Sequence, residues 1–347
     1  MNCSKLIRLP AEWEKQSFLQ FTFPHKNSDW DYLFKEVSAC FAEIIKATAQ
    51  FQETLVVCKD VSQVKPYFEN TKNIFFTEAE SNDTWARDHG GITVIENNKA
   101  VIQDYIFNGW GNKFEAELDN QITKTIFGSG VFQQCEFKSF DFVLEGGSIE
   151  SDGKGTVLTT SDCLLSKTRN PDLSKQKIEN VLIENFGAEQ FLWLNHGYLA
   201  GDDTDSHIDT LVRFCDENTI VYTGCNNPKD EHYKALHLMK EELKEFKNRE
   251  EKRYKLIELP LPDACFDSSR QRLPATYANF TIINHAVLVP IYGVAQDKRA
   301  IEIIQQCFPH KKIIAINCRT LIEQHGSLHC VTMQYPEPVK LNKKILE

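Results

Sequence analysis

The sequence lacks several features that would mark other classes of protein. None of its eleven cysteines forms a Cys-x-x-Cys pair and their number is odd, which argues against a structural zinc site and against a disulfide framework. It contains no Gly-x-Ser-x-Gly motif, so serine hydrolase chemistry has no support. Lys and Arg number 39 against 49 for Asp and Glu, and a net charge of −10 argues against a nucleic-acid partner.

Long apolar runs and linkers are also missing. No run approaches the roughly 18 apolar residues that a membrane span needs, and the N-terminus has no apolar core of a secretion signal. We therefore expect a cytoplasmic protein without a membrane partner. No Pro/Gly/Ser-rich or low-complexity tract divides the chain, so residues 1–347 are predicted to form a single domain.

What the sequence does have is a fivefold recurrence of one pattern. Five times a polar cluster is followed by a short apolar run, a turn and a second apolar run, although the last block keeps only its first run. The clusters are marked by Asp88, Glu145, His207, Asn279 and Cys330, at steps of 57, 62, 72 and 51 residues. These steps are too long for a solenoid, whereas radial repetition about an axis would bring all five clusters to one pocket.

Helical periodicity lies between the blocks. Apolar residues recur at i, i+3, i+4 and i+7, and strand-like runs follow most of these segments, which predicts a strand–strand–helix–strand unit permuted at the chain ends. The predicted helices are 30–49, 118–127, 173–186, 231–247 and 297–308. The mixed charges of 240–255 are expected on a solvated helix face.

The residue types in the clusters suit attack on a cationic carbon. Cys330 is the strongest nucleophile of the set once it is ionised, and His207 can carry protons near neutral pH. Asp88, Asp209 and Glu145 would repel one another unless a cation lies between them. A planar guanidinium presents donors that carboxylates accept in pairs, and its central carbon is the electrophile.

Two other classes of function stay open at this level. The loop GDDTDSHID (201–209) holds Asp202, Asp203, Asp205, His207 and Asp209, a density that suits Mn²⁺ or Ca²⁺ and a metal-dependent ureohydrolase. A two-metal site would need further clusters of this kind, and the other candidate is the pair at 88–89. A propeller that binds without catalysing is the third interpretation, because a fold does not determine a function.

Seven motifs occur in the order found in one family. The chain resembles the agmatine deiminase family and the related bacterial peptidylarginine deiminase type over about residues 8–338. The motifs are RLPAEWE, NDTWARDHGG, FNGWGNKF, LEGGSIESDGKGTVLTTSDCLLSKTRNP, DSHIDTLVRF, YANFTIINHAVLVP and HGSLHCVTMQYP. The resemblance implies a five-bladed α/β propeller of the guanidine-modifying superfamily, with ββαβ repeats. It also implies hydrolysis of a guanidinium to a ureido group with release of ammonia, without a metal or an organic cofactor.

The resemblance also implies roles for individual residues. Cys330 would form a covalent amidino-thioether, and His207 would protonate the departing ammonia and then activate water. Asp88 and Asp209 would hold the guanidinium nitrogens, and Glu145 would support the pocket beside His207. Trp85 and Asn279 complete the predicted substrate-binding set, which also contains Asp88 and Asp209.

Two departures from the family pattern bear on the substrate. The segment after PAEWE has Gln20 and Phe23 where tryptophan is expected, and the approach to the nucleophile reads EQHGSLHC in place of GGGNIHC. Agmatine, giving N-carbamoylputrescine, is the substrate we expect, with free or peptidyl arginine as the alternative. An arginine carboxylate would need a cationic partner, for which the candidates are Arg87, Arg169, Arg270 and Arg272. Family members are often dimers, so a homodimer is implied.

Overall fold

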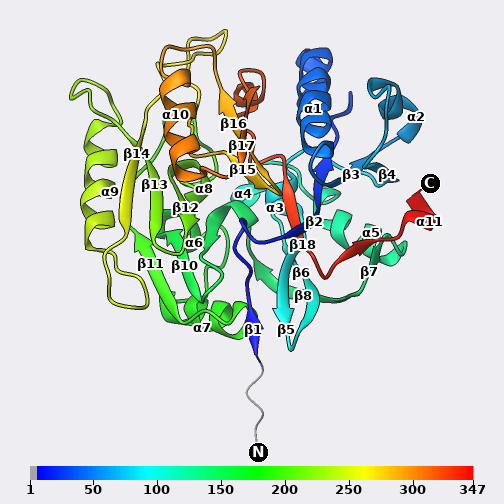
Figure 1. Ribbon diagram of the computed structural model, residues 1–347, viewed down its shortest axis with the longest axis horizontal. Helices are drawn as coiled ribbons and strands as arrows, with labels where there is room; N and C mark the ends of the chain where they lie inside the picture. The colour runs from blue at the N-terminus through cyan, green and yellow to red at the C-terminus, as the bar shows by residue number, and fades with distance from the viewer. Residues whose placement is uncertain (1–5, 347) are drawn as a thin grey trace, which may run out of the picture.

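Four hairpins, each extended by a third strand, account for most of the sheet structure. The computed structural model describes residues 6–346 and has a mixed α/β fold (Figure 1). In each of these sheets two antiparallel strands are joined by a short turn, and the second strand pairs in parallel with the third. The strands are β5 (Ile92–Glu96), β6 (Lys99–Ile106) and β8 (Cys135–Val143); β9 (Ile149–Ser151), β10 (Thr156–Thr160) and β11 (Gln190–Leu194); β12 (Val212–Asp216), β13 (Thr219–Gly224) and β14 (Lys255–Pro260); and β15 (Thr281–Ile283), β16 (Ala286–Ile291) and β17 (Lys312–Asn317).

The turn residues explain why the chain reverses where it does. Asn97 and Asn98 both have positive φ, 50° and 64°, which is the conformation of the two-residue turn that matches the twist of a hairpin. Glu96 therefore pairs directly with Lys99. Asparagine tolerates this conformation better than most residues do, because its short side chain can bond to the local backbone.

The fifth sheet is assembled from both ends of the chain. The C-terminal strand β18 (Met333–Pro336) pairs antiparallel with β2 (Gln16–Thr22), which pairs in parallel with β3 (Glu53–Cys58), and β3 pairs with β4 (Ile74–Glu78). Figure 1 shows β18 in red beside β2 in blue. The second strand that the last sequence block lacks is thus supplied by the N-terminal segment, which confirms the predicted permutation. Shorter strands complete the pairing: β1 (Ile7–Arg8) on β5, and β19 (Lys340–Leu341) on β7 (Phe132–Gln133).

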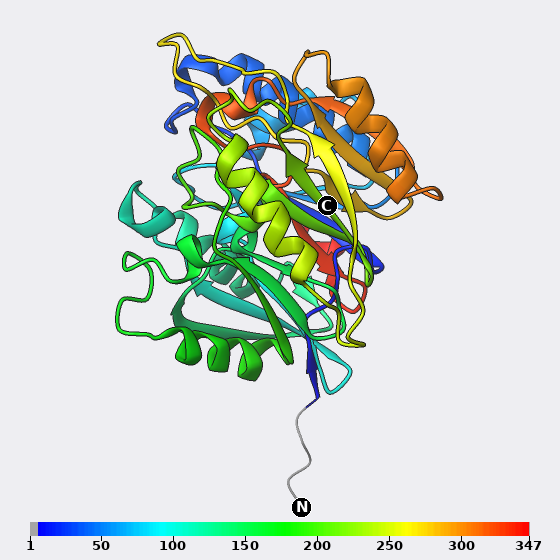
Figure 2. The ribbon, with the colours of Figure 1, turned by 90° about the vertical axis from the view of Figure 1, so that its left-hand side faces the viewer.

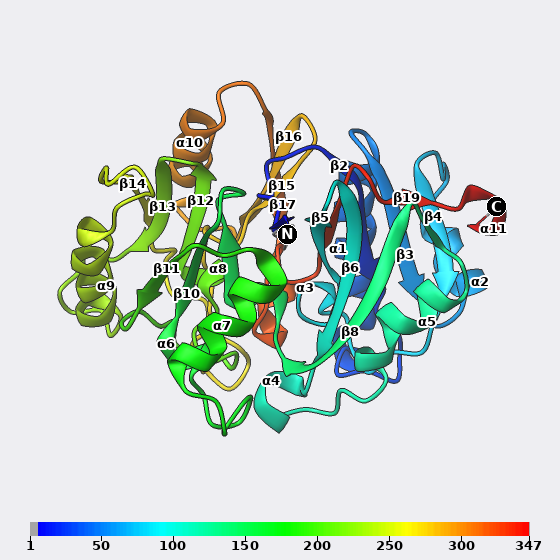
Figure 3. The same ribbon diagram turned by 90° about the horizontal axis from the view of Figure 1, so that it is seen from below.

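The main helices cross between the second and third strands and lie outside the sheets (Figures 2 and 3). Their inner faces are apolar at helical spacing, as in α10, where Ala300, Ile303 and Ile304 are buried. In α7, Ser174 caps the first turn, and Gly187 ends the helix with φ of 66°, where a side chain would collide with the carbonyl of Ile7. The helices are α1 (Phe34–Ala49), α5 (Ile122–Gly128), α7 (Lys175–Phe186), α9 (Tyr233–Glu245) and α10 (Asp297–Cys307).

All five predicted helices are therefore present, with three differences. The segment 30–49 begins as a 3₁₀ turn at Asp31–Leu33 before α1. The segment 118–127 begins as a 3₁₀ turn at Asp119–Gln121 before α5. The mixed-charge run was wrongly expected to be helical throughout, because α9 ends at Glu245. The chain then reverses through a bridge between Lys247 and Arg253 and enters β14, since Phe246 adopts an extended conformation at the helix end.

The remaining helices are single turns. They are α2 (Val61–Val64), α3 (Ala86–His89), α4 (Gly109–Asn112), α6 (Ser161–Leu164), α8 (Ile208–Leu211) and α11 (Lys343–Leu346). Within residues 6–346, no helix has both the length and the apolar character required to cross a bilayer.

Candidate active site

One-turn elements that directly precede a strand hold most of the predicted site residues. Asp88 lies in α3, which leads into β5, and Asp209 lies in α8, which leads into β12. Glu145 begins the 3₁₀ turn Gly146–Ser148 that leads into β9, and Cys330 comes shortly before β18. Each sheet therefore delivers its polar cluster from the start of its first strand.

Asp88 and His207 meet across Gly147. The Oδ1 atom of Asp88 lies 3.6 Å from Nδ1 of His207 and accepts a hydrogen bond of 3.0 Å from the backbone N–H of Gly147. A Cβ atom on Gly147 would lie 2.6 Å from His207 Nδ1, 2.9 Å from Asp88 Oδ1 and 3.2 Å from Asp209 Oδ2. The second glycine of LEGG is required here because three ionisable side chains converge on the space that a side chain would fill.

Cys330 is held between Asn279 and Asp209. The Sγ atom lies 3.4 Å from Oδ1 of Asn279 and 4.0 Å from Oδ2 of Asp209. Asn279 also accepts the backbone N–H of His329 at 2.8 Å and donates to the backbone oxygen of Asp209 at 3.3 Å. The amide of Asn279 thereby links the backbone of His329, which precedes the thiol in the chain, to the backbone of Asp209.

A cleft leads from the surface to this thiol, and we call it the active-site cleft. Among the described residues its lining includes five aspartates and neither an arginine nor a lysine. Cys330 is 6% exposed and lines the cleft, whereas Asp209, Glu145 and Asn279 are completely buried behind it. The lining residues are Asp29, Asp83, Trp85, Asp88, Trp110, Phe114, Asp202, Asp203, Thr204, Thr210, Gln324, His325, Gly326 and Cys330.

Two tryptophans form one wall of the active-site cleft. The rings of Trp85 and Trp110 meet edge to face with centroids 6.4 Å apart, and the indole N–H of Trp110 donates to Asp88 Oδ2 at 2.9 Å. Trp85 donates to Asp83 at 2.8 Å, and Gly326 passes so close to its ring that a side chain there would overlap it. The aromatic faces bound a slot of the kind that accommodates a planar cation.

Glu145 is held by a buried arginine. Nε of Arg169 donates to both carboxylate oxygens, at 2.9 and 3.0 Å, and Nη1 donates to Asp205 at 2.5 Å. Both Arg169 and Glu145 have side chains that are 0% exposed. Glu145 is therefore near His207 but is already neutralised, unlike Asp88.

The two aspartates nearest the thiol differ in charge state. Burial raises the pKa of Asp88 well above its ordinary value, and the neighbouring Asp209 raises it further. Burial also acts to raise the pKa of Asp209, but the hydrogen bond and charge of His329 outweigh it, so that this pKa is lowered. Asp209 is thus ionised near neutral pH, whereas Asp88 tends to be protonated while the cleft holds no cation.

Burial also shifts the pKa values of the His207 imidazole and the Cys330 thiol. It lowers the pKa of His207 to about 3, and it raises the pKa of the Cys330 thiol, with Asp209 and Asp88 raising it further. His207 Nε2 and Asp209 Oδ1 are buried and have no hydrogen-bond partner. Buried polar atoms without a hydrogen-bond partner cost free energy. Two such atoms in the same cluster are typical of a site that binds a polar substrate.

One group of the described residues could hold a metal, and its carboxylate is already paired. Among residues 6–346 one group has ligand atoms within 4.8 Å of one another, formed by Glu145, Cys163 and His207, and Arg169 occupies both oxygens of Glu145. The aspartates of the 201–209 loop do not form such a group. Asp202 accepts from Thr204 and Ser206 within its own loop, and Asp205 pairs with Lys113 and Arg169. Asp202 thus shapes the loop itself, and Asp205 joins it to neighbouring segments.

The two sequence departures lie in different places, since the departing residues after PAEWE are buried away from the cleft, whereas Gln324 and His325 before the nucleophile line it. Gln20 and Phe23 are buried, where Gln20 accepts from Tyr335 and Phe23 packs against Phe41. His325, from the changed segment before the nucleophile, does line the cleft, and its Nδ1 lies 2.6 Å from the backbone oxygen of Gly201.

None of the four candidate arginines lines the active-site cleft. Arg169 is bonded to Glu145, Arg272 pairs with Asp230 at 3.0 Å, and Arg270 is exposed. Arg87 is buried and lines a different cleft. The cleft therefore offers no arginine to a substrate carboxylate.

The sequence did not identify Trp110 and His329 as site residues, and it indicated Arg169 only as a candidate partner of a substrate carboxylate. Trp110, Arg169 and His329 contact predicted site residues directly. Each lies in a motif that was recognised, FNGWGN, SKTRNP and SLHC, so the family motifs held the signal. Their partners are 22, 24 and 120 residues away, which spacing alone does not indicate.

Known proteins resemble the chain in sequence and in fold. Residues 8–336 match the family described as Porphyromonas-type peptidyl-arginine deiminase. The chain is 30% identical to the agmatine deiminase of Pseudomonas aeruginosa, over 96% of each chain. A structure of a Cys-to-Ser variant of C. jejuni agmatine deiminase with substrate bound is 39% identical, with a TM-score of 0.92 over 97% of this chain and 98% of that one. A Porphyromonas gingivalis structure provisionally named an arginine deiminase is 46% identical, with a TM-score of 0.93 over 96% and 100% of the two chains.

Proposed function

Because the chain belongs to the Porphyromonas-type peptidyl-arginine deiminase family, we propose that it hydrolyses agmatine to N-carbamoylputrescine and ammonia. It is a hydrolase that acts on C–N bonds of amidines. The observation that carries the choice of agmatine is the charge of the active-site cleft, whose lining holds five aspartates and, among the described residues, no arginine or lysine. A substrate with a cation at each end suits such a lining, whereas a free arginine carboxylate would be repelled.

The first half-reaction uses the thiol as a nucleophile. The guanidinium binds between Asp88 and Asp209, and its charge offsets the carboxylates that disfavour the thiolate. The Cys330 proton passes to His207, and the sulfur attacks the guanidinium carbon to give a tetrahedral adduct. His207 then returns this proton to the departing nitrogen, the C–N bond breaks, ammonia leaves, and an amidino-thioether stays on Cys330.

The second half-reaction is hydrolysis of the thioether. His207 removes a proton from water, the hydroxide adds to the amidino carbon, and the C–S bond breaks to give the ureido product. The imidazolium then returns its proton to the thiolate, and the hydroxyl proton of the adduct passes to solvent, where ammonia takes it up as ammonium, so the protons balance. Asn279 holds the thiol by the contact of 3.4 Å, and Trp85 bounds the guanidinium plane. Glu145 supports His207 from the pair that it forms with Arg169.

The architecture is part of the same proposal. Five sheets, each beginning with a site-bearing segment, support a single five-bladed α/β propeller domain over residues 1–347. We expect the enzyme to act as a homodimer without a metal or an organic cofactor.

Release of ammonia and of a ureido product from agmatine, free arginine and a short arginine peptide tests this function. Each substrate is assayed with and without EDTA, using wild-type protein and Cys330→Ala as the control. We expect turnover of agmatine that EDTA leaves unchanged and that the variant lacks. Turnover only of arginine or of the peptide would overturn the substrate. Activity that EDTA removes and Mn²⁺ restores would favour the ureohydrolase mechanism.

A further inference from the structure

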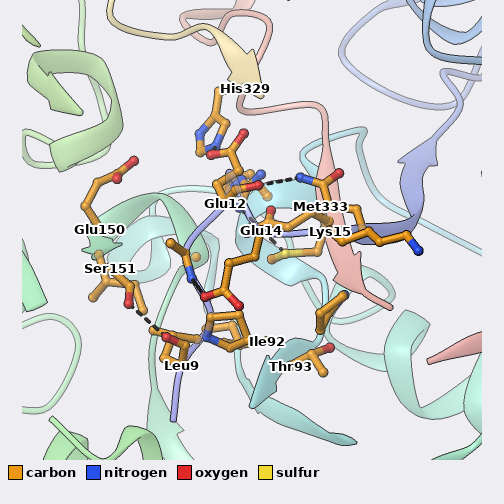
Figure 4. A pocket seen from close by; sticks show the side chains of 18 residues that line it. Leu9, Glu12, Glu14, Lys15, Ile92, Thr93, Glu150, Ser151, His329 and Met333 are labelled. Carbon is orange, nitrogen blue, oxygen red and sulfur yellow. Dashed lines mark hydrogen bonds and ion pairs between the residues drawn. The ribbon is translucent and has the colours of Figure 1, made fainter. Parts of the chain in front are cut away.

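A second cleft lies behind the catalytic residues. It shares no lining residue with the active-site cleft, yet it is lined by the chain neighbours of three proposed catalytic residues: Arg87 next to Asp88, Gly146 next to Glu145, and His329 next to Cys330. Arg87 and Asp88, and likewise His329 and Cys330, line different clefts although they are adjacent in the chain, so the backbone of these turns runs between the two clefts. Figure 4 shows the second cleft, with His329 above Glu12 and with Glu150 to one side.

His329 joins the two clefts. Its Nδ1 lies 2.7 Å from Oδ2 of Asp209, and its Nε2 lies 2.9 Å from Oε2 of Glu12. Glu12 is ionised, since Arg213 and His329 lower its pKa against the effect of burial. Ionised carboxylate oxygens only accept hydrogen bonds, so each ring nitrogen is placed to donate to a carboxylate, which is the arrangement that an imidazolium makes. The histidine is 2% exposed, which makes both bonds strong and directional.

Glu12 is itself firmly anchored. Its Oε2 also accepts from Nη2 of Arg213, and its Oε1 accepts the backbone N–H of Ile282 at 2.6 Å. Arg213 is completely buried and pairs with Glu150 as well. The charges alternate along the series Asp209, His329, Glu12, Arg213 and Glu150. Because every link is hydrogen bonded, His329 has one available orientation.

The other charged groups around Asp209 do not perform this task. On the side of the active-site cleft its neighbours are Asp88, His207 and the Cys330 thiol, and none of them supplies a fixed positive charge. On the far side Arg87 and Arg213 act on Asp209 only through space, and the Nε and Nη2 atoms of Arg87 have no hydrogen-bond partner. His329 is the hydrogen-bonded cation of Asp209 among the described residues.

We propose that His329, held by Glu12, is a positioning residue that keeps Asp209 ionised and turned so that its free oxygen receives the guanidinium. The inference rests on the proposed function, because it assigns Asp209 to substrate binding. Oδ2 of Asp209 is taken by His329, and Oδ1 is the buried atom that has no partner. Asp88, which has only neutral donors, depends on the substrate for its charge, whereas Asp209 is charged before the substrate arrives.

Two variants of His329 separate its two bonds. The amide of His329→Asn retains a donor near the position of Nδ1, toward Asp209. The amide of His329→Gln retains one near the position of Nε2, toward Glu12. Both are neutral. His232→Asn is the matched control, since His232 is also a buried histidine bonded to an aspartate, at 2.7 Å from Asp230, and lines neither cleft.

The first readout needs no turnover. Carbon-13 NMR follows the titration of the Asp209 carboxyl, identified by comparison with Asp209→Asn. In His329→Gln, burial and Asp88 act on Asp209 without the opposing imidazolium, so its titration should move to higher pH by one unit or more. His329→Asn should move it less, and His232→Asn should not move it. Glu12→Gln supplies the same test if neither His329 variant folds, with a smaller upward shift expected.

The second readout is the split between KM and kcat for agmatine. KM should rise about tenfold in His329→Gln, the loss expected for one charge-assisted hydrogen bond, with a smaller fall in kcat. An Asp209 titration that is the same in every folded variant would overturn the proposal. So would a KM in His329→Gln that matches that of His232→Asn. Wild-type protein that turns over no guanidine would contradict the proposed function, while the NMR titration would still decide whether His329 controls Asp209.

Discussion

The active-site cleft and the second cleft differ in how their buried carboxylates are neutralised. In the second cleft Glu12 and Glu150 both bond to Arg213, and Glu12 also bonds to His329. In the active-site cleft the carboxylates of Asp83 and Asp88 accept from neutral donors, the indole N–H groups of the two wall tryptophans among them. Glu12 and Glu150 therefore have positively charged partners, whereas Asp83 and Asp88 have neutral ones.

Without charged partners, ionising Asp83 and Asp88 costs free energy, and a cationic ligand can remove this cost. Burial raises the pKa of Asp83 to about 7, and burial together with Asp209 raises the pKa of Asp88 well above its ordinary value. A cation that enters the cleft favours the ionised forms and so gains affinity from carboxylates that the protein left without partners. Neutralised carboxylates hold the fold together, whereas unneutralised ones are available for binding.

Removing the counter-ion of the second cleft should have the largest effect. Arg213→Gln leaves Glu12 and Glu150 buried without their shared cation, so the free energy of unfolding should fall by about 5 kcal/mol. Urea denaturation measures the change. Arg319→Gln is the control, because Arg319 pairs with Glu323 at the surface and should lose less than about 1 kcal/mol. Equal losses in the two variants would show that the buried network contributes no more stability than a surface ion pair.

Removing a carboxylate of the active-site cleft should lower the activity and not the stability. Asp88→Asn is expected to lower kcat/KM for agmatine on the order of a thousandfold, because a guanidinium partner that aligns the carbon with Cys330 is lost. Its stability should be unchanged or higher, since the variant removes a buried carboxylate that lacks a counter-ion. Steady-state kinetics and urea denaturation on the same sample test both parts. A destabilised Asp88→Asn protein would contradict the division between the two clefts.

Residues of the active-site cleft could be predicted from the sequence, whereas the charged network of the second cleft could not. Asp88, His207, Asp209 and Cys330 are recognisable because they begin repeated blocks and because their residue types suit one chemistry. The hairpins and helices were predictable for a similar reason, since periodicity and turn residues act over a few positions. His329 and Glu12 are 317 residues apart. Their contact arises only when the C-terminal strand β18 pairs with β2, and no local pattern encodes that distance.

The smallest effect is expected at Asp203, farther along the wall of the active-site cleft. Asp203 lines the cleft, and its side chain forms no ion pair within residues 6–346. If it attracts the distal ammonium of agmatine, Asp203→Asn should raise KM for agmatine severalfold, the size expected for a partly solvated charge pair. KM for butylguanidine, which lacks that ammonium, should stay the same in this variant. The exposed Asp162→Asn provides a control that changes net charge equally.

The pH dependence of this preference sharpens the test. Burial raises the pKa of Asp203 to about 6, so the carboxyl is charged above that pH and becomes neutral as the pH falls through it. The ratio of kcat/KM for agmatine to that for butylguanidine should therefore decline below about pH 6 in the wild-type protein. In Asp203→Asn the same ratio should be lower at neutral pH and flat across this range, because no charge is left to titrate. A ratio that declines identically in both proteins would assign the ammonium to another of the aspartates in the cleft and limit Asp203 to shaping its loop.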